Sequence, residues 1–168
     1  MVGAGVANIN AATKLIDNGY KGKIKIIDMG KDPHDRLPEE VMTGMLGAGG
    51  WSDGKLTYHT EVGGQLSKYC GNEKAMELMD QVINNFKRFH LVDNGVEFYW
   101  QWRVTKIDFK TKHIDMTSEK YLQSDDDWIF FDKLIFGVGK SGIDFGKRLA
   151  EKYKLKTEPK AVQIGVRF

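Results

Sequence analysis

The spacing of hydrophobic and polar residues predicts helices and strands in alternation along the first half of the chain. Residues 7–16 form an apolar run that is compatible with a helix and ends at Asn18-Gly19. Residues 23–28 then alternate polar and apolar side chains, which is typical of a half-buried strand. Apolar residues recur at steps of three and four over residues 73–90, so a helix with one broad apolar stripe is predicted there, capped by Asn72.

The second half of the chain predicts a small β meander followed by a strand and a helix. Alternation typical of short antiparallel strands recurs in three segments, which are residues 96–109, 113–116 and 121–122. Residues 124–127 predict a solvated acidic turn, and residues 132–136 predict a strand. A helix to about Tyr153 follows, with Ser141 and Asp144 in a capping-box pattern. The order predicts one α/β layered domain, residues 1–168, with a β-meander insertion at about 96–131.

Composition narrows the class of protein. Hydrophobic residues make up 41% of the 168 residues and charged residues 29%, which is typical of a soluble globular domain. A net charge of +2 is too small to indicate nucleic acid or an anionic membrane as partner. The single cysteine, Cys70, cannot form an internal disulfide, and no apolar run approaches the length of a membrane span. A cytoplasmic protein that contacts neither nucleic acid nor membrane is expected.

The start of the chain carries a candidate nucleotide site. Gly3 and Gly5 form a turn before the first predicted helix, and the following strand ends in Asp28. Turn, helix, strand and acid is the order of a dinucleotide-binding half-unit. In such a unit the glycines and the next amides, here those of Val6 and Ala7, hold a pyrophosphate, and the acid receives the ribose hydroxyls.

Two features depart from that order. Asn8 occupies the place of the third fingerprint glycine, which should loosen helix–strand packing or push the helix away from the pyrophosphate. Only Met1 and Val2 precede the turn, where a strand of four or more residues is expected. Because a bare Gly-x-Gly is also common in ordinary turns, the downstream strand and its acid carry the nucleotide hypothesis.

A second glycine motif lies at Gly137, Gly139 and Gly142, between a predicted strand and a predicted helix. It is not a phosphate-binding P-loop, because Leu134 stands where that motif needs a glycine. A second dinucleotide site is disfavoured because residues 161–168 end in no acid. Strand ends of an open α/β sheet meet at one edge, so both glycine motifs are predicted to lie on one ligand.

Residues 47–56 contain too many glycines for a helix or a strand. Glycines flanking Ser, Asp and Lys suit close approach of the backbone to a flat or anionic ligand, with a flexible loop as the alternative. The candidate residues are Gly49, Gly50, Ser52, Asp53 and Lys55. Lys31 and Arg36, in the irregular segment before them, could meet a phosphate or a partner carboxylate, but a solvated loop is favoured.

These motifs resemble the N-terminal part of flavin-dependent oxidoreductases of the glutathione-reductase-like superfamily, and in particular their FAD-dependent dehydrogenase branch. Gly3-Ala4-Gly5 is similar to the first dinucleotide motif, and Asp28 takes the position of the acid that holds the adenosine ribose. The Ser-Asp-Gly-Lys-Leu segment at residues 52–56 is similar to one expected near the flavin. Val104 fits the strand residue whose backbone meets adenine, and Gly137-Val138-Gly139 stands where the superfamily usually has Ala-Thr-Gly.

The resemblance implies a Rossmann-like FAD/NAD(P)-binding layered fold, incomplete at both ends. It implies FAD as cofactor, NAD(P) as a candidate electron donor, and hydride or electron transfer to a small-molecule substrate that the sequence does not identify. Ser52, Asp53 and Lys55 would approach the ribitol or the ring. The chain stops before the family's substrate domain and late Gly-Asp motif, so a missing C-terminal half or a partner chain is expected.

Two alternatives stay open at this stage. The chain could be a truncated or split, non-catalytic subunit with weak or no nucleotide binding. It could also be an NAD-dependent or thiazole-synthase-like enzyme that uses a nucleotide without flavin. No catalytic residue is assigned, because His59, His90 and His113 have no visible partner in the sequence, and no metal site is expected.

Overall fold

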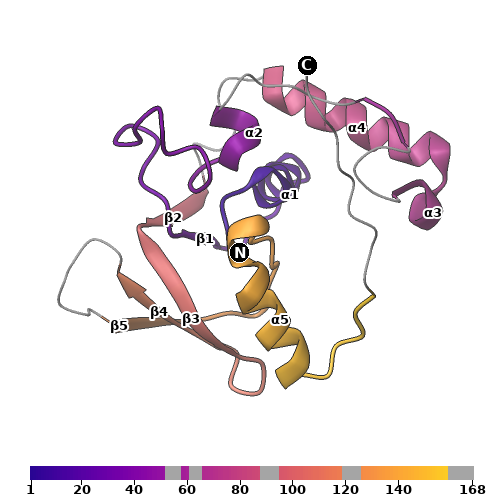
Figure 1. Ribbon diagram of the computed structural model, residues 1–168. Coiled ribbons are helices and arrows are strands. Elements are labelled where there is room, and N and C mark those ends of the chain that lie inside the picture. Colours follow the sequence, from indigo (N-terminus) through magenta and orange to yellow (C-terminus); the bar gives the residue numbers. More distant parts are fainter. Residues whose placement is uncertain (52–57, 61–65, 88–94, 119–125, 159–168) are drawn as a thin grey trace, which may run out of the picture.

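A computed structural model of the chain describes residues 1–51, 58–60, 66–87, 95–118 and 126–158. It is a mixed α/β structure in which a small parallel sheet lies beside a three-stranded antiparallel sheet, with helices around both (Figure 1). The helices are α1 (Val6–Asp17), α2 (Gly47–Trp51), α3 (Leu66–Cys70), α4 (Asn72–Lys87) and α5 (Ile143–Lys152), with a 3₁₀ turn η1 (Lys140–Gly142) before α5. The strands are β1 (Ile24–Asp28), β2 (Val96–Trp100), β3 (Trp102–Asp108), β4 (His113–Ser118) and β5 (Asp126–Phe130).

Strand β2 belongs to the parallel sheet. It pairs with β1, and the register runs from Ile24 opposite Val96 to Asp28 opposite Trp100. The prediction that residues 96–100 form an antiparallel strand of the meander is therefore wrong. Alternation identifies a half-buried strand, but it is the same whichever way the neighbouring strand runs.

Val2 extends the parallel sheet beyond β1 through single-residue bridges. It bridges Ile27 on one side and Phe136 on the other, both in parallel orientation. Its amide donates to Ile135 O (2.9 Å), and its carbonyl accepts from the amide of Gly137 (2.9 Å). The predicted strand at residues 132–136 is thus present only as a bridge at Phe136, and the short segment before the first glycine turn is hydrogen-bonded on both sides.

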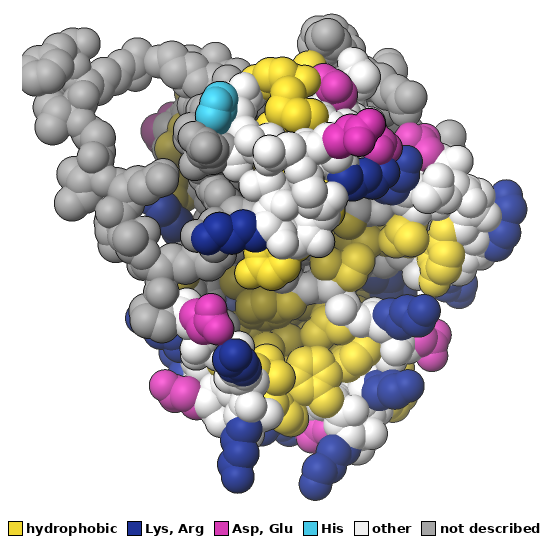
Figure 2. Space-filling model, turned by 90° about the vertical axis from the view of Figure 1, so that its right-hand side faces the viewer, with side chains coloured by type: hydrophobic (Ala, Val, Ile, Leu, Met, Phe, Trp, Pro, Cys, Tyr) yellow, Lys and Arg dark blue, Asp and Glu magenta, His cyan; other side chains and the backbone are white. Residues whose placement is uncertain are grey.

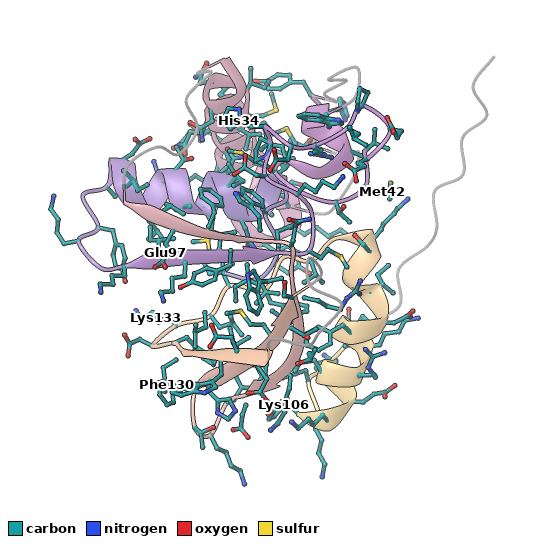
Figure 3. All side chains as sticks on the ribbon, turned by 90° about the vertical axis from the view of Figure 1, so that its left-hand side faces the viewer. His34, Met42, Glu97, Lys106, Phe130 and Lys133 are labelled. Carbon is teal, nitrogen blue, oxygen red and sulfur yellow. The ribbon has the colours of Figure 1, made fainter. Side chains whose placement is uncertain are left out.

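The antiparallel meander has the order β3-β4-β5. Its inward-facing residues Ile107, Ile114 and Met116 are buried in one core with Val2 and with Leu149 of α5. Figure 3 shows the labelled Phe130 and Lys106 on this sheet, at the opposite end of the molecule from His34.

The end of the meander differs from the expected acidic turn. Asp126 and Asp127 lie in β5, which pairs with β4 through residues 113–117. Residues 121–122 and 124–125 of the predicted strand and turn lie outside the described residues.

Helix α1 covers the parallel sheet as its apolar run predicts. Ile9 and Ala12 of the helix are buried against Ile24 and Ile26 of β1. Helix α4 (Asn72–Lys87) is present where a helix was predicted, but Asn72 is its first residue and not a cap before it, and residues 88–90 of the predicted range lie outside the described part of the chain. No described helix is both long and apolar enough to cross a membrane.

Two local predictions about helices are wrong. Residues 47–51 form the short helix α2 despite their three glycines. Arg36 donates to Gly47 O (3.4 Å) and Trp51 Nε1 donates to Leu37 O (3.2 Å), and such tertiary contacts can override the low helix propensity of glycine. The Ser141–Asp144 capping box is absent: η1 occupies residues 140–142, and Gly142 precedes α5 without a side-chain cap.

Hydrophobic side chains gather across the middle of the molecule when it is seen from the right of Figure 1, and Lys and Arg side chains are spread around them (Figure 2). No broad basic surface covers this face, in keeping with the net charge of +2.

Candidate functional site

A pocket of about 350 Å³ lies where the first glycine turn (Gly3–Gly5), the end of β1, the start of β3 and the second glycine loop (residues 137–142) meet. Its volume is within the range of roughly 300–1,000 Å³ that is usual for small-molecule sites. A segment between β1 and α2 closes another side of it, through Met42, Thr43 and Gly44. Figure 3 shows Met42 extending from that segment toward the side of the molecule on which α5 lies.

The pocket brings together most of the described residues that the sequence assigned to a cofactor. Those that line it are Gly3, Gly5, Val6, Asp28, Val104, Gly137 and Gly139. Ala7 does not line it, and neither do Gly49 and Gly50, which lie in α2. Ser52, Asp53 and Lys55 lie outside the described residues.

The two glycine motifs touch each other directly. Gly3 has φ +91°, and a Cβ at this position would lie 2.5 Å from the carbonyl oxygen of Gly137. Only a residue without a side chain allows this approach and this backbone conformation. Gly139 also has positive φ (+58°), but no atom lies within 4 Å of where its Cβ would be.

Asp28 is held by backbone amides from three segments. Its Oδ2 accepts from the amide of Ala4 (2.6 Å), and its Oδ1 accepts from the amides of Gly30 (2.7 Å) and Gly44 (2.9 Å). A carboxylate has about four acceptor positions. The three described donors therefore leave about one acceptor position, on Oδ2.

Helix α1 points an uncapped N-terminus at the first glycine turn. Gly5 is the N-cap, no side chain caps the helix, and its first turn contains no acid. The first helical hydrogen bond runs from the amide of Ile9 to Gly5 O (3.1 Å), so the amides before it have no intrahelical partner. Free amides and the positive end of the helix dipole attract an anion here.

Asn8 does not loosen the packing of α1 on the sheet, so the first of the two effects predicted for it is wrong. Its side chain is fully buried, and Nδ2 donates to Val2 O (2.8 Å) and Gly3 O (2.7 Å). Oδ1 is buried without a hydrogen-bond partner in the described structure. At the position where the fingerprint has a glycine, the side chain of Asn8 thus makes two hydrogen bonds, one to Gly3 in the glycine turn and one to Val2 just before it.

Arg36 is buried, not solvated as the sequence suggested, at 6% exposure. Its guanidinium donates to the carbonyl oxygens of Glu40 (2.7 Å), Val41 (3.0 Å) and Met45 (2.9 Å). It also lies over the ring of Trp51, 4.4 Å from the ring centroid. Burial lowers the pKa of Arg36 from its ordinary value, while the carboxylates of Asp28 and Glu40 act in the opposite direction.

Arg36 therefore shapes the wall formed by residues 40–48. Met42, Thr43, Gly44, Leu46, Gly47 and Ala48 of this wall line the pocket. Leu46 N also donates to Ala4 O (2.8 Å), which ties the wall to the first glycine turn. Sequence reasoning missed this role because its only signal was a single arginine in an irregular segment.

The charged residues at the pocket favour an anionic ligand. Arg103, Lys140 and Arg148 line it, and Asp28 is the one acid among those lining residues that the structure describes. Apolar side chains of Met29, Trp102 and Phe145 line it too. In the described part of the chain no group of three or more His, Cys, Asp or Glu side chains is placed to hold a metal ion.

Comparison of the sequence with protein-family models and with curated proteins finds no match. The functional assignment therefore depends on the geometry of the pocket and on the motifs that form it.

Proposed function

We propose that this pocket binds the adenosine diphosphate half of FAD and that the chain forms the FAD-binding part of a flavin-dependent oxidoreductase with a Rossmann-like fold. The observation that carries the proposal is the meeting of both glycine motifs and Asp28 at one pocket. Parallel pairing of Val2 with Ile27 and with Phe136 supports the same arrangement, because it brings the ends of these segments to one edge.

The residues present fit the chemistry of an adenosine diphosphate. The uncapped N-terminus of α1 offers amides to a diphosphate. The remaining acceptor position on Asp28 Oδ2 offers a partner to a ribose hydroxyl. Trp102, Val104 and Phe145 give the pocket apolar surface for a flat ring, and Arg103, Lys140 and Arg148 offset the negative charge of the phosphates.

We assign only half of FAD to the pocket because its volume of about 350 Å³ is near the lower bound for small-molecule sites. When bound, the flavin would supply hydride or electron transfer, with NAD(P) as a candidate electron donor. The chain's own part is to bind and orient the adenosine end. A small-molecule substrate and a cytoplasmic location belong to the same proposal.

A second candidate is an NAD-dependent or thiazole-synthase-like enzyme without flavin. The size of the pocket fits NAD as well as FAD, because both dinucleotides contain adenosine diphosphate. A non-catalytic, split subunit remains the third candidate.

The test is the visible absorption of the purified protein, followed by calorimetric titration with FAD, NAD and ADP. A yellow protein, or a colourless one that takes up FAD more tightly than ADP and NAD, supports the flavin proposal. Tight binding of NAD but not FAD supports the second candidate. A folded protein that binds none of the three overturns both.

A variant of Asp28 tests the proposed contact between its carboxylate and the ribose. Asp28→Asn keeps one acceptor oxygen for the surrounding amides but removes the charge, and it is expected to weaken ADP binding by on the order of 1–3 kcal/mol. Because the new NH2 group cannot accept, at least one of the three amide contacts is lost, and thermal unfolding of the same variant measures what that loss costs the fold. An unchanged ADP affinity in a folded Asp28→Asn protein would show that the ribose lies elsewhere.

A further inference from the structure

We propose that Asn8 and Gly137 act together, as the Asn8–Gly137 pair. Asn8 positions the first glycine turn and Asp28 for the ligand. Gly137, which has no side chain, leaves the space that the Asn8 side chain occupies. Because the turn is a diphosphate site only under the proposed function, the inference rests on that function.

Asn8 reaches Asp28 through a single peptide group. Its Nδ2 donates to the carbonyl oxygen of Gly3 (2.7 Å), and the amide of the same peptide, that of Ala4, donates to Asp28 Oδ2 (2.6 Å). A trans peptide is planar, and its C=O and N–H point in opposite directions. Fixing the carbonyl at one end therefore fixes the direction of the amide at the other, and with it the carboxylate oxygen.

Such a chain of hydrogen bonds is also cooperative, because each bond polarises the next. The donor at Gly3 O makes the Ala4 amide a stronger donor to Asp28. Asn8 thus acts on the carboxylate assigned to the ribose without lining the pocket, which makes it a positioning residue.

The second bond of Asn8 ties the turn to the second glycine loop. Nδ2 donates to Val2 O (2.8 Å), and the same oxygen accepts the amide of Gly137 (2.9 Å). One carboxamide thereby joins the first turn of α1, the residue before the glycine turn, and the loop that forms the opposite side of the pocket.

Gly137 is the residue that makes this possible. A Cβ at position 137 would lie 2.7 Å from Asn8 Oδ1 and 2.9 Å from its Cγ. The carboxamide has no free direction in which to move, since it is fully buried and held by two hydrogen bonds. A methyl group at 137 would therefore break the contacts of Asn8 with the turn.

The unpaired oxygen of Asn8 argues against simple space filling. Oδ1 is buried without a partner among the described residues, which is unfavourable and uncommon in native structures. An apolar side chain would fill the same volume without that loss. What asparagine adds is the pair of donor contacts to Val2 and Gly3.

The first measurement needs no ligand: amide hydrogen exchange of Asn8→Ala compared with the parent protein. Protection of the Ala4 amide is expected to fall at least tenfold, because its peptide is no longer fixed. The amide of Ile9, bonded to Gly5 O in α1, serves as the internal reference and should keep its protection. Equal protection of Ala4 in both proteins would overturn the inference, and so would a matched loss at Ile9, which indicates general loosening of the helix.

The second measurement is a double-mutant cycle with Asn8→Ala and Gly137→Ala, read by thermal unfolding. Gly137→Ala alone should lower the midpoint strongly, and adding Asn8→Ala should recover part of that loss because the clash is gone. Gly139→Ala is the matched control, since no atom lies near its Cβ position; its effect should add to that of Asn8→Ala. Additive behaviour of the Gly137 cycle would overturn the proposed steric coupling.

ADP titration then separates this inference from the proposed function. If the parent protein binds ADP, Asn8→Ala should weaken binding about tenfold, and the double variant should stay weak although its stability recovers. Full recovery of ADP affinity in the double variant would show that Asn8 only fills space. If the parent protein binds no adenine nucleotide, the proposed function fails, and the exchange and unfolding data alone decide the coupling between Asn8 and Gly137.

Discussion

Two walls of the pocket are built in opposite ways. On one wall, Gly3 and Gly137 let two backbones touch with no side chain between them. On the other, residues 40–48 have their carbonyl groups gathered around the single buried guanidinium of Arg36. The first, which we call the glycine wall, cannot tolerate an added side-chain atom. The second, which we call the arginine wall, depends on the hydrogen-bond donors that Arg36 supplies.

The largest expected effect is on the glycine wall. Gly3→Ala places a methyl group 2.5 Å from Gly137 O at φ +91°, and it should destabilise the protein by roughly 3 kcal/mol or more through steric overlap and backbone strain together. Chemical denaturation of the purified variant measures the loss.

Gly139→Ala is the control for that variant. Its φ of +58° and ψ of −156° are strained for alanine, but its Cβ meets no neighbour, so only about 1–3 kcal/mol, the cost of the backbone strain, should be lost. Equal losses at the two positions would show that close contact between the loops contributes nothing to stability.

The stability of the arginine wall should fall even when the charge at position 36 is kept. Arg36→Lys retains a cation but loses the planar fork that reaches several carbonyl groups at once. We expect a loss of roughly 2–3 kcal/mol in unfolding free energy, the scale of a hydrogen bond to a charged group. Fluorescence of Trp51, which lies against Arg36, should change with it. A variant as stable as the parent, with unchanged fluorescence, would mean that the guanidinium does not hold this wall.

The smallest effect is a dependence on pH at the edge of the arginine wall. Glu40 accepts the amide of Leu37 (2.8 Å) and pairs with Lys31 (2.9 Å), and these contacts, the amide first, hold the pKa of Glu40 below its ordinary value of 4.5. Because the folded-state pKa is the lower one, its contribution is fully present above pH 4.5 and is lost as pH falls through the folded value.

Glu40→Gln isolates that contribution. The difference in stability between parent and variant should be small and constant above pH 4.5, and should shrink below it. A difference that stays constant through this range would contradict the assigned shift.

The sequence predicted the parts of the fold that are encoded locally. The turn at Gly3, helix α1, strand β1 and the acid at Asp28 follow one another within a short stretch, and each has its own period or turn residue. The pairing of β2 could not be predicted in the same way. Its neighbour β1 lies far away in the sequence, and alternation does not encode strand direction.

For the candidate site, the sequence predicted that the two glycine motifs would lie together, and they line one pocket with Asp28. What remained hidden depends on tertiary contacts: Arg36 donates to carbonyl groups that no sequence pattern marks, and it also contacts Gly47 and Trp51 of α2. Asn8 was recognised as a departure from the fingerprint. Its consequence was predicted wrongly because the neighbour that accommodates it, Gly137, lies in the other half of the chain.

The overlap between the side chain of Asn8 and any methyl group at position 137 makes these two positions interdependent. Asparagine at position 8 fits beside glycine at 137, whereas a larger residue at 137 needs a smaller side chain at position 8. Any redesign of the residues around the pocket must therefore treat positions 8 and 137 as a single choice.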